Sequence, residues 1–144
     1  MEVPKNNQAF KALHDEKKLI YNSKHFLLEL YRCDFEKIND ESFLRCTLNN
    51  AAKLANAQVL NLISNKFEPQ GVTAIALLAE SHLSIHTWPE AHYSAVDIFT
   101  CGQNMKPEIS CKYLIQALMA EEHLLRIINR NPPTKVNSQI KTIN

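Results

Sequence analysis

Two neighbouring segments with a strict two-residue alternation constrain the fold of this chain most strongly. Residues 81–88 alternate as an extended strand does, and residues 94–101 alternate again after a short connection that begins at Pro89. A connection this short joins antiparallel strands, because a parallel pair needs a crossover of a dozen residues or more. One face of the first strand would carry polar and aromatic side chains, namely His82, Ser84, His86 and Trp88.

The remaining periodicities extend this sheet and add helices. Either Asn39 or Asp40 can cap a helix whose apolar residues recur at helical spacing up to Ala55, and a second helix follows Pro107. The resulting prediction is an α+β fold, a two-layer sandwich of a largely antiparallel sheet with helices on one face. Four further apolar runs have the length of strands: 25–31, 58–66, 72–78 and 123–129.

The length of 144 residues suits one domain with one hydrophobic core. We expect residues 23–130 to form that domain. Residues 1–22 are polar and read as an N-terminal extension, with a short helix over 8–20. Residues 131–144 contain Pro132-Pro133 and many polar side chains, so we expect a disordered tail.

Composition argues against several classes of protein. The formal net charge of +1 provides no general attraction to nucleic acid or to anionic lipid. No apolar run approaches the roughly 20 residues that span a bilayer, and the N-terminus lacks the pattern of a secretory signal, so a cytoplasmic location is expected. The two glycines are too few for a phosphate-binding loop or a dinucleotide fingerprint. The four cysteines form no C-x-x-C pair and are expected to be reduced.

The segment from residue 79 to residue 102 is unusually rich in reactive side chains, and two ordinary explanations compete for it. His82 and His86 have the H-x-x-x-H spacing that holds zinc on a helix. On a strand the same two residues lie about 13 Å apart, too far for one metal ion, so we expect no metal site. The other explanation is structural, and for His82 or His92 taken alone, packing within an ordinary core explains the residue.

A third explanation comes from the order of the residues. Residues 80–90 read ESHLSIHTWPE and residues 97–102 read DIFTCG, with LYRCD at 30–34 and FEPQGV at 67–72 upstream. This arrangement resembles the pyruvoyl-dependent S-adenosylmethionine decarboxylase proenzymes of bacteria and archaea, over residues 24–128. The block from 80 to 90 is specific enough that chance is a poor explanation.

The resemblance implies that the chain cuts itself between Glu80 and Ser81. The products would be a β chain of residues 1–80 and an α chain of residues 81–144, and Ser81 would become the pyruvoyl cofactor that forms a Schiff base with the substrate. Neither pyridoxal phosphate nor a metal would be needed. His86 matches the family's processing base, and Thr73 falls where the family has a serine that assists processing.

The resemblance also implies a substrate and a reaction. S-adenosylmethionine would lose carbon dioxide, and the product would donate its aminopropyl group in spermidine biosynthesis. Cys101 matches the proton donor of the reaction. Phe67 and Trp88 match aromatic residues that flank the adenine ring, and Glu90 matches the acid that binds the ribose hydroxyls. A homo-oligomer of the processed unit is expected.

Two departures and two alternatives accompany the resemblance. Arg32 and His92 stand where the family commonly has glycine, and if glycine at position 92 needs a positive φ angle, His92 must reshape that turn. One alternative function is a pyruvoyl decarboxylase of the same fold that acts on arginine or ornithine. The other is a non-catalytic relative that regulates an active partner.

Overall fold

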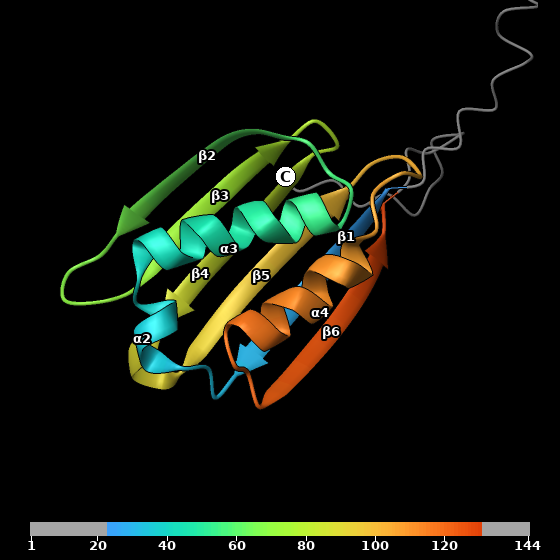
Figure 1. Ribbon diagram of the computed structural model, residues 1–144. Helices are drawn as coiled ribbons and strands as arrows, with labels where there is room; N and C mark the ends of the chain where they lie inside the picture. Colours follow the sequence, from blue (N-terminus) through green and yellow to red (C-terminus); the bar gives the residue numbers. More distant parts are fainter. Residues whose placement is uncertain (1–22, 131–144) are drawn as a thin grey trace, which may run out of the picture.

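The alternating segments form the middle of a six-stranded antiparallel sheet in the structure, a computed structural model that describes residues 23–130 (Figure 1). The strand order is β2-β3-β4-β5-β1-β6. The helix expected over 8–20 and the tail from 131 lie outside the described residues. The strands are β1 (Lys24–Tyr31), β2 (Val59–Lys66), β3 (Val72–Leu78), β4 (His82–Trp88), β5 (Tyr93–Thr100) and β6 (Glu122–Asn129).

Three helices cover one face of this sheet: α2 (Phe35–Ile38), α3 (Glu41–Leu54) and α4 (Pro107–Ala117). Asp40 caps α3 by accepting a hydrogen bond from the Phe43 backbone N–H at 2.9 Å, whereas Asn39 ends α2. Pro107 occupies the first turn of α4. The predicted α+β sandwich is confirmed. The short α2 and a 3₁₀ turn, η1 (Pro89–Ala91), are additional elements that the sequence did not predict.

The hydrophobic core lies between the helices and the covered face of the sheet. Leu44 and Leu48 of α3 and Leu114 of α4 are fully buried there against alternate residues of the strands. In β1 the buried positions are Phe26, Leu28 and Leu30, so the intervening side chains point to the opposite side. Among the described residues no helix covers that opposite side, which we call the open face of the sheet.

Side chains on the open face lie in rows across the strands, because the register of the sheet aligns them. One row contains His25, Phe99, His82 and Leu77, and it lies at the end of the sheet where β4 begins. A row near the other end contains Tyr31, Tyr93 and Trp88. Several large apolar side chains of this face are exposed, namely Tyr31, Ile63, Leu77, Trp88, Leu124 and Ile128.

The turn that contains His92 keeps a positive φ angle. His92 has φ 50° and ψ 37°, a left-handed conformation that glycine adopts more easily. Its Nδ1–H donates to the Cys33 carbonyl oxygen at 3.0 Å, and its ring packs edge-on against Phe35 with centroids 6.1 Å apart. Arg32 is also left-handed, with φ 53°. His92 therefore adopts the left-handed conformation and does not reshape the turn. The contacts of its side chain stabilise this conformation.

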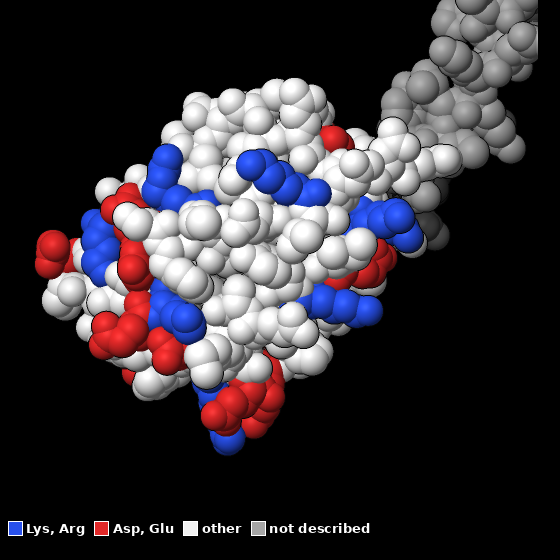
Figure 2. All heavy atoms as spheres, viewed as in Figure 1, with Lys and Arg blue, Asp and Glu red and all other residues white. Residues whose placement is uncertain are grey.

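The helix-covered face has no large area of one charge. Figure 2 shows acidic and basic side chains interspersed around its rim, with a largely uncharged middle. None of the helices within residues 23–130 is long and apolar enough to cross a membrane.

Candidate active site

Ser81 lies in the tight turn between β3 and β4, half-buried at one end of the open face. The Leu78 N–H donates to the Ser81 carbonyl oxygen at 2.9 Å and closes the turn. The carboxylate of Glu80 accepts from the Gln58 N–H at 3.1 and 3.3 Å. The Ser81 hydroxyl oxygen and His82 Nδ1 are 3.3 Å apart. The bond between Glu80 and Ser81 is thus held from both sides in an accessible turn.

Cys101 lies at the same end of the open face as Ser81. His82 pairs with Phe99 in the ladder between β4 and β5, so the residue before His82 lies beside the end of β5. Cys101 follows β5 directly, is exposed, and accepts from the Ser23 hydroxyl at 3.5 Å. The sequence predicted both residues for the site, and the fold places them in adjacent strand ends.

Two other cysteines differ from Cys101 in environment. Cys33 and Cys111 are buried free thiols. Burial raises the pKa of Cys33, and burial together with the charge of Glu108 raises the pKa of Cys111 to about 12. Both therefore stay protonated at neutral pH and pack as small apolar side chains.

His86 and Thr73 form a pair toward the other end of the face. They are opposite each other in the ladder between β3 and β4, and the Thr73 hydroxyl and His86 Nδ1 are 2.9 Å apart. His86 is four residues beyond His82 on a continuous strand, a separation of about 13 Å. One copy of the chain therefore does not bring His86 to Ser81.

The residues predicted to bind substrate lie beyond this pair. Trp88 stacks on Tyr93 with ring centroids 5.2 Å apart, and Tyr93 stacks on Tyr31 at 5.5 Å. Trp88 and Phe67 are 43% and 48% exposed, so both retain ring surface for a ligand. Glu90 accepts from the Gln70 side-chain amide at 3.1 Å, which ties it to the hairpin that carries Phe67.

Two polar pairs on the open face were missed from the sequence. His25 Nε2 donates to Asp97 Oδ1 at 2.9 Å, and the Tyr93 hydroxyl donates to Glu29. Burial and the neighbouring Glu29 raise the pKa of Tyr93 above its usual range, so the phenol remains a donor. The sequence does contain the signal, because His25, Glu29 and Tyr31 alternate with Phe26, Leu28 and Leu30, as in a strand with one covered face.

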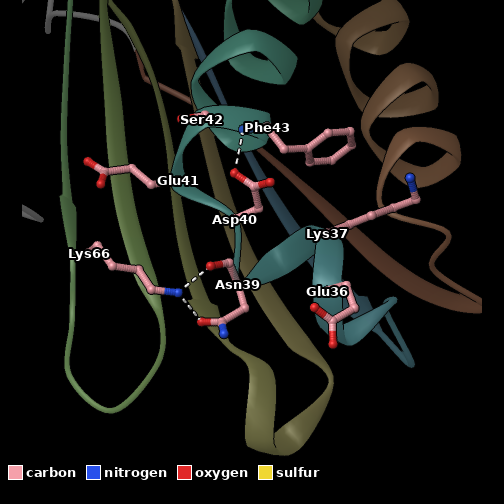
Figure 3. A pocket seen from close by; sticks show the side chains of 8 residues that line it. All are labelled: Glu36, Lys37, Asn39, Asp40, Glu41, Ser42, Phe43 and Lys66. Atoms are coloured by element: carbon pink, nitrogen blue, oxygen red, sulfur yellow. Dashed lines mark hydrogen bonds between the residues drawn. The ribbon is translucent and has the colours of Figure 1, made fainter.

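A separate hollow lies on the helix side of the molecule, where α2 meets α3 (Figure 3). The Lys66 ammonium group donates to the backbone and side-chain oxygens of Asn39, and the Gly71 N–H donates to Asn39 Oδ1 at 3.1 Å. These bonds fix both ends of the turn that carries Phe67. None of the residues predicted for catalysis lines the hollow.

His82 and His86 lie on a strand and not on a helix, as the alternation predicted. Within the part of the chain that the structure describes, no three His, Cys, Asp or Glu side chains are grouped so that they could hold a metal ion.

Comparison with known proteins identifies the family. The profile of the S-adenosylmethionine decarboxylase family matches residues 24–131. The chain belongs to this family. The S-adenosylmethionine decarboxylase proenzyme of Prochlorococcus marinus strain MIT 9313 is 56% identical over 118 residues, which cover 82% of this chain and 94% of that relative. Proenzyme 2 of Bacillus anthracis is 43% identical, covering 73% and 86%, and the archaeal proenzyme of Methanococcus maripaludis is 42% identical, covering 74% and 88%.

The fold agrees with a solved member of the S-adenosylmethionine decarboxylase family. The crystal structure of the adenosylmethionine decarboxylase from Aquifex aeolicus matches with a TM-score of 0.74 at 34% identity, covering 83% of this chain and 98% of that one. The resemblance inferred from residues 24–128 is thereby confirmed in sequence and in fold.

Proposed function

We propose that this chain cuts itself between Glu80 and Ser81 and then decarboxylates S-adenosylmethionine. The products would be carbon dioxide and decarboxylated S-adenosylmethionine, the aminopropyl donor of spermidine biosynthesis, and we place the reaction in the cytoplasm. The observation that carries the proposal is the meeting of the Glu80–Ser81 bond and Cys101 at one end of the open face, in a chain of this family.

The fold is compatible with two chains that stay together after the cut. The bond lies in the turn between β3 and β4, outside the ladder of five residue pairs that joins those strands. Cleavage would therefore leave the sheet intact, with β1, β2 and β3 in residues 1–80 and β4, β5 and β6 in residues 81–144. The helix α3 of the first chain also packs on α4 of the second.

The residues around Ser81 suit a pyruvoyl group at that position. Ser81 is outside the strand ladder and half-buried, and its hydroxyl oxygen is 3.3 Å from Nδ1 of His82 on the open face. When formed, this group would act as the electron sink that decarboxylation of an amino acid needs. Cys101, at the neighbouring strand end, would donate a proton to the α-carbon of the product. Trp88 and Phe67 would stack on the adenine ring, and Glu90 would accept hydrogen bonds from the ribose.

We propose further that the active unit contains two copies packed through their open faces. Two observations support this: His86 is about 13 Å along the strand from the residue next to Ser81, and the open face exposes large apolar side chains. A twofold axis that runs across the strands would lay the Ser81 end of one sheet over the Trp88 end of the other, about 10 Å away. His86 of the partner subunit would then reach Ser81 and remove its α-proton, with the hydroxyl of Thr73 positioning the imidazole.

Intact mass of the denatured, reduced protein tests the cleavage. We expect two fragments, residues 1–80 and 81–144, the second lighter by one ammonia than a peptide that begins with serine. A single uncut chain after long incubation would reject the enzyme and favour the non-catalytic relative.

The substrate needs a separate test, because a decarboxylase of arginine or ornithine would show the same fragments. We expect the purified protein to release carbon dioxide from S-adenosylmethionine and not from the two basic amino acids. The adenosine-binding set of Phe67, Trp88 and Glu90 favours this result. Turnover of arginine or ornithine alone would overturn the choice of substrate and leave the cleavage mechanism standing.

A further inference from the structure

The proposed self-cleavage requires two proton removals at Ser81, and one of them has no assigned base. The first proton leaves the hydroxyl when Oγ attacks the Glu80 carbonyl carbon, and the second leaves the α-carbon in the later elimination. His86 is assigned to the second removal. The first needs an acceptor within hydrogen-bond reach of Oγ.

His82 is placed to be that acceptor. Its Nδ1 is 3.3 Å from Ser81 Oγ, a contact between adjacent residues at the point where β4 begins. In the tautomer that carries its ring proton on Nε2, Nδ1 has a free lone pair and accepts the hydrogen of this bond. This is the neutral tautomer that a general base needs.

We infer that His82 is the catalytic base of the first step of self-cleavage, an inference that rests on the proposed function. The hydroxyl proton of Ser81 moves to His82 Nδ1 as Oγ bonds to the carbonyl carbon of Glu80. The bond between that carbon and the Ser81 nitrogen then breaks, and Nδ1 returns the proton to the nitrogen. An ester and a free amine replace the amide, with no other reactant.

Neighbouring rings hold His82 in this orientation. Phe99 of β5 lies at a centroid distance of 5.9 Å, and His25 of β1 meets the His82 ring edge-on at 6.4 Å. His25 is itself fixed by its 2.9 Å bond to Asp97. The ring contacts of His82 are those of an ordinary packed histidine, and they orient its imidazole toward the reacting oxygen of Ser81.

The charged and titratable groups facing His82 come from several elements. β1 contributes His25 and β5 contributes Asp97, while β3 presents the apolar Leu77. Arg130 lies over the Phe99 ring at 4.8 Å, and Cys101 follows β5. A proton on Nδ1 of His82 would block the first step, because Nδ1 could not then accept the hydroxyl proton.

The test is the rate of cleavage of freshly synthesised full-length chain. Asparagine can keep an acceptor near the position of Nδ1 but is not a base, so His82→Asn should slow cleavage by about 100-fold or more. Added imidazole should restore part of the rate in His82→Gly. His123→Asn, which alters an exposed histidine of β6, should cleave at the wild-type rate. Cleavage of His82→Asn at the wild-type rate would overturn the inference.

Hydroxylamine distinguishes the two steps, because it cuts esters and not amides. His86→Ala should accumulate the ester and be cut by hydroxylamine, whereas His82→Asn should remain whole. Ester that accumulates in His82→Asn would overturn the inference and leave the proposed function standing. A wild-type chain that stays uncut would overturn both. If His82→Asn does not fold by circular dichroism, His82→Gln supplies the test: cleavage of this folded variant at the wild-type rate would reject His82 as the base.

Discussion

The two ends of the open face differ in the kind of chemistry that they carry. At the Ser81 end lie the bond to be cut, Cys101 and the pair of His25 with Asp97. At the Trp88 end lie the pair of His86 with Thr73 and a stack of three aromatic rings. One end thus carries the groups that would react, and the other carries a base and a binding surface. The proposed site needs both ends, and the spacing of residues along a strand keeps them about 13 Å or more apart within one sheet.

The largest expected effect comes from removing the reacting hydroxyl. Ser81→Ala should abolish both self-cleavage and decarboxylation, because no ester can form. Intact mass and release of carbon dioxide measure the two losses. Ser84→Ala alters a serine within β4, three residues beyond the cut, and should still be cut. Cleavage of Ser81→Ala after residue 80 would show that the Ser81 end is not the reacting one.

The second effect separates cleavage from turnover at the same end of the face. Cys101→Ala should be cut normally but should decarboxylate S-adenosylmethionine about 100-fold or more slowly, because the product carbanion lacks its proton donor. Intact mass and a steady-state assay measure the two steps. Cys46→Ala, which changes an exposed cysteine of α3, is the matched control and should behave as wild type. Equal rates for both variants would remove Cys101 from the reaction.

The third prediction tests whether the Ser81 end of one copy meets the Trp88 end of a second copy. Alone, Ser81→Ala and His86→Ala should both remain uncut. When they are co-expressed in equal amounts, about half of the His86→Ala chains should be cut, because random pairing gives them a partner with an intact His86. Intact mass identifies which chain is cut. Mixed oligomers without any cleavage would mean that the two ends do not complement each other across copies.

The smallest effect concerns the turn at the Trp88 end. His92→Val should destabilise the fold by about 1–3 kcal/mol, because a β-branched residue resists the left-handed conformation and the bond to the Cys33 carbonyl is lost. His92→Gly should be close to neutral, since easier backbone geometry offsets the lost bond. Urea unfolding at fixed protein concentration in the uncut Ser81→Ala background measures both. A valine variant as stable as wild type would show that the turn tolerates any residue.

Much of the fold was predictable because its signals are local. Alternation predicted a strand over 81–88, and the structure has it over His82–Trp88 with the expected faces. Asp40 was one of two candidate caps, and its carboxylate caps α3. The helix α2 and the turn η1 were missed, because elements of four and three residues are too short to show a period.

The candidate site was predictable in its residues but not in its arrangement. Ser81, His86 and Cys101 were predicted from a motif, which records residue types and their order. The pair of His25 and Asp97 joins residues 72 positions apart, and no local pattern links them. The distance between His86 and Ser81 follows from the same strand spacing that argues against a zinc site. This distance bears on function only when both residues are known to lie near opposite ends of the open face.

By itself the sequence determined the strands, the faces of those strands, the family and the bond expected to break, since alternation, capping and motif are properties of short segments. Tertiary structure alone decided the order of the other strands, and so brought His25 of β1 to Asp97 and to the His82 ring at the Ser81 end. It also decided which strand residues lie on the face that no helix covers within residues 23–130. The physical reason is that strand order and layer packing depend on how much apolar surface the whole chain buries. The pattern within a single segment does not determine that total.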